Sequence, residues 1–421
     1  MSKFILNKGL SEHHQFYTDG ETFDHEQPSD FLKINFQSLP DKPVYTVYNN
    51  QGENRITTSY YVGADWLIRN QLAIHVEPKI DTASAKTDYL GMFVKALQHS
   101  DVCNHTARLY EIKIDSPQIE INKEDDLITP LLIIRYIQLL KGIVKKGLRR
   151  DYVTAEQNLT GNIKGKILVT KTVAKNHFQA NKAKTYCRFQ EHSFNCVENR
   201  VLKKAYNFCI RYSNQFQLHF NRDAINFINP AFEKVSSTVD LNELRTMKFG
   251  GLYKEYNEAL RLAKFILRRF GNNINSVSKK ESVKVPPFWI DMSLLFELYV
   301  LGLLKDRFGT QVKYHFKSLG NELDFLLKTE DYKMVIDAKY KPKYLRTKDN
   351  DDMRQISGYA RLKRVYEELG VLYPKSIDCL IVYPEQESGN SNLNGINLKG
   401  NPIKQYEGFY KVGLVLPLQK K

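Results

Sequence analysis

Hydrophobic and polar positions along the first 120 residues follow the pattern of β-strands. The segments "PVYTVYNN", "RITTSYYVGADWLI" and "QLAIHVEPKI" carry β-branched and aromatic residues with partial alternation, and Asn, Gly and Gln separate them. Alternate residues of a strand point to opposite faces, so this pattern predicts a region rich in β-sheet.

From about residue 126 to 270 the spacing of apolar residues becomes helical. The segments "LITPLLIIRYIQLLKGIVKKGL", "NRVLKKAYNFCIRYSNQF" and "YKEYNEALRLAKFILRRFG" have apolar residues three to four positions apart, and the first ends near Gly147. A polar run, "GNNINSVSKKESVKVPPF" at 271–288, follows and is predicted to be a linker, because it offers little apolar surface to bury.

After this run, helical and strand patterns alternate. The expected order is a helix at about 291–305, strands at about 311–316, 322–328 and 333–340, a helix at about 351–368, a strand at 376–384 and a last strand "GFYKVGLVLPL".

The chain has 421 residues, which is too long for one ordinary core. The patterns predict an α+β multidomain protein with a β-rich N-terminal domain at 1–125 and a mainly helical middle region at 126–275. The remainder, 276–421, is predicted to be a C-terminal α/β domain with a mixed central sheet.

Composition indicates a globular protein outside the membrane. Hydrophobic residues make up 42% and aromatic residues 12%, which suits a packed core. Apolar runs such as "LLFELYVLGLL" are shorter than the roughly 20 residues that a membrane span needs. The N-terminus "MSKFILNKGLSEHH" has no signal-peptide pattern, which predicts a cytoplasmic protein.

The five cysteines do not indicate a disulfide framework, because they are odd in number and widely spread. Cys187, His192 and Cys196 lie close enough in sequence to be considered as zinc ligands. Their spacing matches no common zinc pattern and no fourth ligand stands nearby, so a zinc site is disfavoured.

The net charge of +15 and the pI of about 9.3 are compatible with a polyanionic partner such as DNA. A merely soluble basic protein has the same balance, and charge does not separate the two. The basic residues are spread along the chain, with a local concentration between Arg135 and Tyr152.

The stretch "NELDFLLKTEDYKMVIDAKYKPKY" at 321–344 is the strongest candidate for chemistry. In a strand, Asp337 and Lys339 point the same way, and a hairpin through "KTEDY" would bring Asp324 close to Asp337. Two carboxylates with a backbone carbonyl, that of Ala338, and waters are a plausible Mg²⁺ site, and a nearby lysine can stabilise a phosphate in the transition state. The alternative is that these charges only cover the outer face of a hairpin.

Two neighbouring segments bear on that alternative. Glu297 is a single carboxylate in the apolar helix "DMSLLFELYVLGLL", and a buried charge needs a partner or a metal. Gln355 follows the Asp-capped helix start "DDMRQISGYARL". A salt bridge at the rim explains Glu297 equally well, and Gln355 is either beside the strand or on the surface.

At these residues the chain resembles McrC, the family of nuclease subunits of McrBC modification-dependent restriction systems, and more broadly the PD-(D/E)xK nucleases. In the C-terminal part, "FWIDMSLLFELYV", "ELDFLL", "VIDAKYK" and "DMRQISGYA" occur in the family's order and spacing. Upstream, the similar segments are "VEPKI", "LGMFVKAL", "LLKGIVKKGLRRDYVTAEQNLTGNIKGKI" and "ENRVLKKA".

The resemblance implies a restriction-endonuclease-like C-terminal domain and a role for each candidate residue. Asp324 and Asp337 would be the metal ligands and Lys339 the catalytic lysine. Glu297 would be the helix acid near the metal and Gln355 the glutamine of the motif. Leu323 stands where the motif usually has proline, a residue that shapes the strand without touching the metal.

The resemblance also implies partners. Proteins of this family bind a hexameric AAA+ GTPase, McrB, through the N-terminal region, stimulate its GTP hydrolysis and cut double-stranded DNA. This chain has no recognisable nucleotide-binding loop, which agrees with that division of labour. The main alternative is a nuclease-inactive adaptor or GTPase-activating subunit. A stand-alone DNA-binding protein is disfavoured, because no helix-turn-helix or zinc finger is recognisable.

Overall fold

The computed structural model describes most of the chain in two compact units. The described residues are 4–6, 15–19, 31–36, 39–50, 53–70, 72–80, 87–96, 102, 105, 108–122, 128–215, 222–240, 251–270, 282–318, 320–341 and 350–418. The first unit combines Met1–Ile128 with Glu281–Lys421, and the second is Thr129–Lys280. The predicted fold class is confirmed, because strands dominate the N-terminal region, helices the middle, and a mixed five-stranded sheet the C-terminal part.

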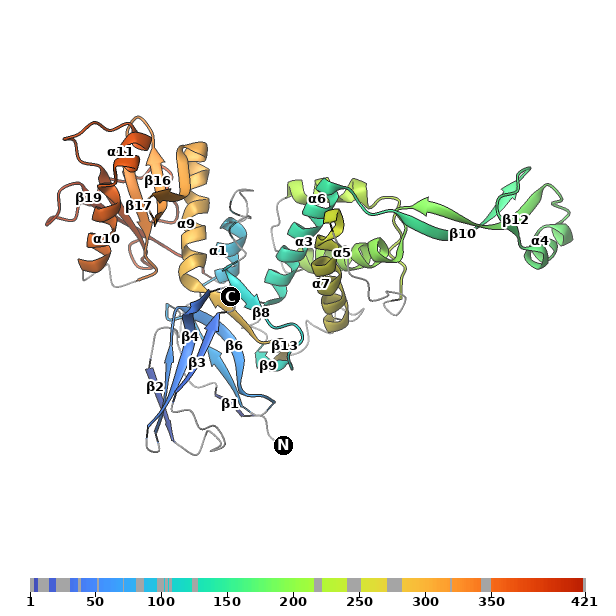
Figure 1. The fold of residues 1–421 in the computed structure, drawn as a ribbon, viewed down its shortest axis with the longest axis horizontal. Helices are drawn as coiled ribbons and strands as arrows, with labels where there is room; N and C mark the ends of the chain where they lie inside the picture. The colour runs from blue at the N-terminus through green and yellow to red at the C-terminus, as the bar shows by residue number, and fades with distance from the viewer. Residues whose placement is uncertain are drawn as a thin grey trace. The chain divides into compact units, whose positions relative to one another are not determined.

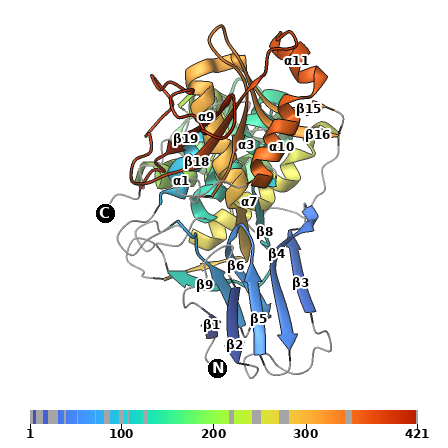
Figure 2. The ribbon, with the colours of Figure 1, turned by 90° about the vertical axis from the view of Figure 1, so that its left-hand side faces the viewer.

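The N-terminal region forms two main sheets. Its strands are β1 (Phe4–Leu6), β2 (Gln15–Asp19), β3 (Phe31–Phe36), β4 (Leu39–Asn50), β5 (Glu53–Thr58), β6 (Tyr61–Ile68), β7 (Leu72–Val76), β8 (Tyr110–Ile112) and β9 (Ile119–Asn122), and helix α1 spans Tyr89–Ala96. One sheet has the order β2-β5-β4-β3, and its strands lie side by side in Figure 2. Tyr45, Ile56 and Trp289 belong to the apolar cluster of this region.

The predicted linker at 271–288 is wrong over its second half. Residues 282–291 form β13 (Ser282–Val285) and β14 (Phe288–Asp291), and β14 completes the sheet β1-β7-β6-β14-β8. A Cβ atom at Gly63 would meet the carbonyl oxygen of Phe288 at 2.1 Å, so this close pairing of β6 with β14 requires glycine. Residues 271–281 lie outside the described residues.

The second unit is inserted between two paired strands of the first. β13 pairs with β9 in antiparallel register, with Ser282 opposite Asn122. The chain therefore leaves the first unit and returns to it at neighbouring positions, as domain insertions commonly do.

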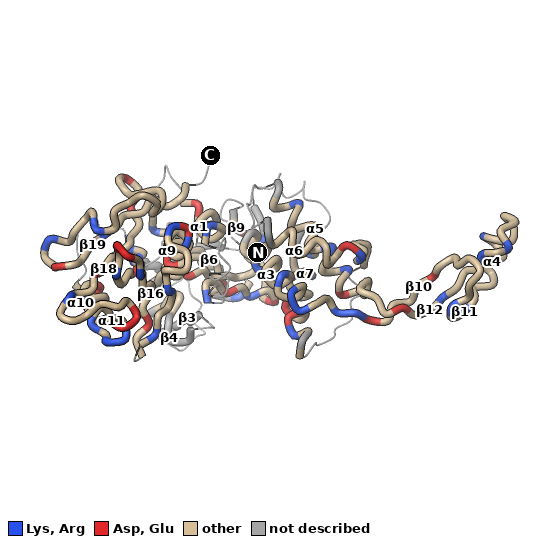
Figure 3. Tube along the Cα trace, turned by 90° about the horizontal axis from the view of Figure 1, so that it is seen from above, with Lys and Arg blue, Asp and Glu red and all other residues tan. Residues whose placement is uncertain are grey.

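Helices form the body of the second unit. They are α3 (Ile128–Lys146), α5 (Val197–Gln215), α6 (Arg222–Ala231) and α7 (Glu255–Phe270), with a short 3₁₀ turn η6 (Gly251–Tyr253). Part of the basic concentration at 135–152 is paired here, because Arg135 binds Glu258 and Lys146 binds Glu255. Across the described residues, Lys and Arg are spread over both units (Figure 3).

A long arm, defined here as residues 151–193, departs from the helical pattern of the middle region. It consists of β10 (Asp151–Thr160), β11 (Lys166–Ile167), α4 (Val169–Lys175), η4 (His177–Gln179) and β12 (Lys184–Ser193), with strand order β10-β12-β11 (Figure 1). The side-chain amides of Asn158 and Asn176 exchange two hydrogen bonds of 2.9 Å. Glu156 binds Lys171 at 2.8 Å and also pairs with Arg188, so the tip is held by its own polar contacts.

The C-terminal sheet has the order β15-β16-β17-β18-β19 and is antiparallel from β15 to β17 and parallel from β17 to β19. Its elements are α9 (Met292–Phe308), η7 (Gly309–Gln311), β15 (Val312–Ser318), β16 (Asn321–Lys328), β17 (Lys333–Ala338), α10 (Asn350–Ala360), α11 (Lys363–Leu369), β18 (Asp378–Pro384) and β19 (Phe409–Leu414). The single helix predicted at 351–368 is thus two. In Figure 1, α9 lies on one side of β16 and β17, while α10 and α11 lie on the other.

Helix α9 is buried on most sides, as its apolar sequence predicts. Asp291 caps it by accepting a 3.0 Å hydrogen bond from the backbone N–H of Leu294. A Cβ atom at Gly302 would lie 3.1 Å from the Cα atom of Ala96, so glycine lets α1 approach α9 closely. None of the helices within the described ranges is both long and apolar enough to span a membrane.

Candidate active site

Asp324 and Asp337 lie opposite each other at the open end of the β16–β17 hairpin. The turn at 329–332 closes this hairpin as "KTEDY" predicts, and the register pairs Phe325 with Ile336. One further step along the register places Asp324 opposite Asp337. Local strand periodicity and a short turn are therefore sufficient to bring the two carboxylates together.

The two carboxylates are held in a buried setting. Oδ2 of Asp324 accepts a 2.9 Å hydrogen bond from the backbone N–H of Ala338. This N–H therefore bonds to a side chain of β16 instead of to a backbone carbonyl of that strand. Asp337 is only 2% exposed. Its Oδ2 atom accepts no well-aligned hydrogen bond from any described residue, although the Lys339 ammonium lies beside it.

Lys339 connects the strand to helix α10. Its Nζ atom lies 2.9 Å from Oδ2 of Asp337 and 3.6 Å from Oδ1 of Asp352, and it donates a 3.0 Å hydrogen bond to Oε1 of Gln355. Its backbone N–H donates to the carbonyl of Val382 at 2.8 Å, which extends the pairing of β17 with β18. Both ends of the residue are thereby fixed.

Burial and like charges raise the pKa of both aspartates. Burial raises the pKa of Asp324 well above its ordinary value, and the charges of Asp337 and Glu297 raise it further. Burial also raises the pKa of Asp337, while the ammonium of Lys339 opposes that rise. Two such carboxylates favour a shared proton or a bound cation.

Lys339 is held in its charged form. Burial alone would lower the pKa of its ammonium, but the carboxylates of Asp337 and Asp352 more than compensate, and the net shift is upward. The side chain therefore enters any reaction as a hydrogen-bond donor and positive charge.

Helix α10 places Gln355 beside the strand and adds Asp352, which the sequence pattern marks only as part of a helix start. Gln355 accepts from Lys339 and donates a 2.8 Å hydrogen bond to the hydroxyl of Tyr359. Asp352 is buried and binds Lys341 at 2.8 Å. Asp352 follows Lys339 by 13 positions, and residue spacing over that distance does not predict how α10 packs against β17.

Glu297 is half-buried and has a partner that the sequence did not indicate. Its Oε1 atom lies 2.9 Å from Nε2 of His315, whose Nδ1 lies 3.0 Å from Oε1 of Glu322. His315 has a φ of +50°, which is uncommon for a residue with a side chain, and the register places it opposite Asp324. The negative charge of Glu297 thus acts on Asp324 and raises its pKa. His315 contacts Glu297 on α9 and Glu322 on β16.

The residues at this centre fit a hard divalent cation in part. The two carboxylates of Asp324 and Asp337 are oxygen ligands of the kind that Mg²⁺ prefers, and the buried Oδ2 atom of Asp337 lacks an aligned donor. Across the described ranges, no three His, Cys, Asp or Glu side chains are arranged to hold a metal ion. A cation here would therefore need backbone oxygen, such as the carbonyl of Ala338, and water to complete its shell.

The zinc alternative receives no support from the geometry. Cys187 and His192 are five residues apart on β12, which corresponds to roughly 16 Å along a strand. Cys196 lies beyond the strand, where burial raises the pKa of its thiol to about 11. The four described cysteines are free and buried.

Comparison with known proteins agrees with the sequence resemblance. The model of a family described as McrBC 5-methylcytosine restriction system component matches residues 56–374. A search of curated proteins gave no match.

Two solved structures are similar at low identity. One is a half-complex from a tetradecameric assembly of Thermococcus gammatolerans McrB AAA+ hexamers with bound McrC, at 16% identity and a TM-score of 0.40, covering 98% of this chain and 94% of that one. The other is the Thermococcus gammatolerans McrBC complex, at 16% identity and a TM-score of 0.29, covering 72% of this chain and 87% of that one.

Proposed function

The chain belongs to the family of McrBC 5-methylcytosine restriction system components, and we propose that within such a system it is the subunit that cleaves double-stranded DNA. The observation that carries this proposal is the group of buried Asp337 with half-buried Asp324 and Lys339 at the end of one hairpin. Two carboxylates can hold a hard divalent cation, and a lysine held as a cation can stabilise charge on a phosphate, so the group can support metal-assisted phosphodiester hydrolysis.

Mg²⁺ would be held by the carboxylates of Asp324 and Asp337 and the carbonyl of Ala338. When bound, it would supply a Lewis acid for the scissile phosphate. The Lys339 ammonium donates hydrogen bonds to the attacking water or to a phosphate oxygen and so balances negative charge that develops there. Overall, the water oxygen bonds to phosphorus and the bond from phosphorus to one sugar oxygen breaks. The water gives up one proton to solvent, and the departing sugar oxygen takes up one proton from solvent.

Gln355 and Glu297 act on this centre as positioning residues. The hydrogen bond from Lys339 to Gln355 fixes the direction of the ammonium, and Tyr359 in turn fixes the amide. Glu297 adds negative charge near Asp324, which strengthens the local attraction for a cation.

The test is cleavage of supercoiled plasmid carrying modified cytosine, with Mg²⁺, GTP and the partner GTPase. Asp337→Ala should abolish cleavage, whereas partner binding and stimulation of GTP hydrolysis should persist. An exposed substitution in the same hairpin, Asp331→Ala, serves as the matched control and should cut normally. A wild-type chain that stimulates GTP hydrolysis without cutting any DNA would instead favour the nuclease-inactive adaptor.

We further propose that the partner is a hexameric AAA+ GTPase similar to McrB. The description of one similar structure, McrB AAA+ hexamers with bound McrC, names such an assembly for that protein. In this chain, the arm carries six of the large apolar side chains that are exposed among the described residues: Tyr152, Ile163, Ile167, Val169, Val173 and Phe178. Apolar side chains gathered on a protruding element are typical of a protein-binding surface.

The arm is therefore the first place to test for partner contact, in addition to the N-terminal region. Phe178 is 83% exposed, so Phe178→Ala should weaken partner binding without lowering thermal stability. Leu372→Ala removes an equally exposed side chain from the other unit and is the matched control. Equal binding by both variants would argue against the arm.

A further inference from the structure

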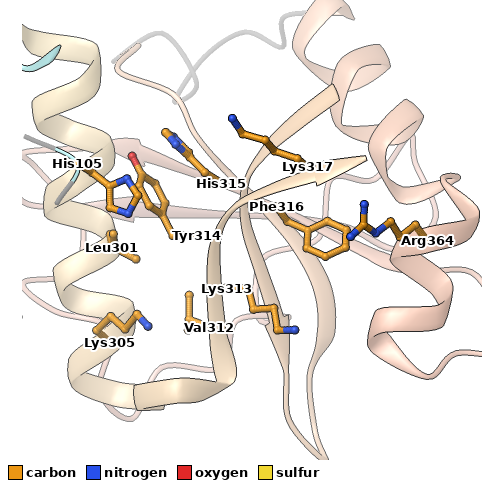
Figure 4. Close-up of a pocket in the computed structure, with 10 residues that line it drawn as sticks. All are labelled: His105, Leu301, Lys305, Val312, Lys313, Tyr314, His315, Phe316, Lys317 and Arg364. Carbon is orange, nitrogen blue, oxygen red and sulfur yellow. The ribbon is translucent and has the colours of Figure 1, made fainter. Parts of the chain in front are cut away.

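A pocket of about 460 Å³ lies along the outer edge of the C-terminal sheet (Figure 4). Strand β15 forms its floor, helix α9 contributes Lys305, and helix α11 contributes Arg364. Lys313 and Lys317 extend from β15 itself. Four cationic side chains from three elements thus line one pocket.

We propose that this pocket binds the phosphodiester backbone of a DNA strand beside the catalytic centre. The inference rests on the proposed nuclease function and assigns to it a substrate-binding site outside the carboxylate–lysine group. The occupant is the sugar–phosphate backbone of DNA.

The charge of the lining supports a polyanion. Among the ten described residues that line the pocket, none is Asp or Glu. The ammonium of Lys313 pairs with Glu368 at 2.6 Å and that of Lys317 lies 3.6 Å from Glu322, while the side chain of Lys317 remains 74% exposed. Exposed cations that can exchange a weak protein partner for phosphate are the usual source of affinity for nucleic acid.

Lysines on an edge strand have another common role, which is to prevent pairing with a second sheet. β15 is such an edge, since among the described strands it pairs only with β16. Edge protection does not require cations from the flanking helices. Lys305 and Arg364 come from such helices, and the guanidinium of Arg364 lies 5.4 Å from the ring centroid of Phe316, which supports its planar group at the pocket wall. A supported guanidinium favours bidentate contact with phosphate oxygens.

The position of the pocket relates it to the reaction. His315 lines it, faces Glu297, and lies opposite Asp324 in the strand register. A backbone held along β15 would consequently pass beside the strand that carries the first carboxylate. A mononucleotide is too short to extend from this pocket along β15 to the catalytic centre. A strand of DNA is therefore the preferred occupant.

The test measures binding without cleavage. The full chain is mixed with a fluorescent DNA duplex in EDTA, and anisotropy is followed over a series of salt concentrations. The pocket variant is Lys317→Ala with Arg364→Ala, and the control is Lys375→Ala with Lys404→Ala, which removes two exposed lysines that do not line the pocket. Thermal melting establishes that both variants remain folded.

The pocket variant should bind DNA roughly tenfold more weakly, and its plot of log affinity against log salt should be less steep by about 2, because two phosphate contacts are lost. The control should retain the wild-type slope. Equal losses in both variants would overturn the proposal, since they would show that only total charge matters. Displacement of DNA by GTP at equal phosphate concentration would also overturn it in favour of a mononucleotide site.

The same variants separate this proposal from the nuclease function. If Asp337→Ala abolishes cutting while the pocket variant binds DNA normally, the nuclease function stands and the pocket proposal fails. If the pocket variant loses DNA binding while the wild type cuts no DNA with its partner, the pocket proposal stands and the nuclease function fails.

Discussion

Nζ of Lys339 lies 2.9 Å from Oδ2 of Asp337, two residues earlier on the same strand. This ion pair raises the pKa of the lysine and keeps it positively charged before any substrate arrives. A lysine held in this way is a poor proton acceptor, so its contribution to hydrolysis is to donate hydrogen bonds and to stabilise negative charge.

Replacing Lys339 by methionine should slow DNA cleavage by about 10²–10³. Methionine keeps most of the side-chain volume but removes the charge, and losing one preorganised donor to a transition state commonly costs about 10²–10³ in rate. Lys341→Met is the matched control, because Lys341 contacts the same acid, Asp352, from two residues further along. Plasmid nicking rates measure the effect, and comparable losses in both variants would mean that only the neutralisation of Asp352 matters.

Replacing Asp324 by asparagine should stabilise the metal-free protein at neutral pH while removing cleavage. Asparagine keeps an acceptor for the N–H of Ala338 but removes the repulsion with Asp337. Because folding raises the pKa of Asp324 above 3.8, its stabilising contribution is complete below that pH and is lost as pH rises through the folded pKa. The advantage of the variant should therefore be larger at pH 8 than at pH 5.

Melting curves in EDTA measure this difference. A gain of about 1 kcal/mol would raise Tm by roughly 2–4 °C in a protein with units of this size. Asp351→Asn, on an exposed side chain of α10, is the control and should show no such trend. If the difference in Tm between Asp324→Asn and the wild type did not change with pH, the ionisation of Asp324 would not be its cause.

Replacing Gln355 by alanine should slow cleavage by about tenfold and leave DNA affinity unchanged. The amide accepts from Lys339 at 3.0 Å, so its loss frees the ammonium to rotate without removing its charge. Arg354→Ala on the neighbouring, exposed position of the same helix is the control. Single-turnover rates at saturating DNA separate a defect in chemistry from one in binding, and weaker binding alone would contradict this role.

Asp65 is predicted to be the most sensitive polar residue of the N-terminal sheet. It is buried, pairs with Lys113 at 2.5 Å and accepts a 3.1 Å hydrogen bond from Nε1 of Trp289. Asp65→Ala should lower the free energy of unfolding by about 3–5 kcal/mol, because it leaves Lys113 and the indole N–H without their acceptor. Urea unfolding tests this, and Asp331→Ala, on an exposed turn, should change stability little.

The parts of the fold that the sequence predicts are those set by local periodicity. The buried helix α9 and the β16–β17 hairpin, and with them the meeting of Asp324 and Asp337, follow from spacing and a short turn. β14 does not, since its partner β6 is far away in the chain and the pairing depends on a glycine at position 63.

In the candidate site, too, local spacing predicts some residues, while others depend on contacts between separate elements. The sequence does not predict the places of Asp352 and His315. The first depends on how α10 packs against β17, and the second on a positive φ and a contact from α9. Packing between elements and unusual backbone angles leave little trace in residue spacing.

The late position of β14 in the chain has a consequence for synthesis. Trp289 must reach Asp65 across 224 residues, and at about 5–20 residues per second the ribosome needs roughly 10 to 45 s to make that interval. During this time β6 is exposed at the edge of an unfinished sheet, while the middle unit is completed from contiguous residues. All residues of the second unit, Thr129–Lys280, are therefore synthesised before the first unit is complete. The sheet β1-β7-β6-β14-β8 gains its strand β14 only afterwards.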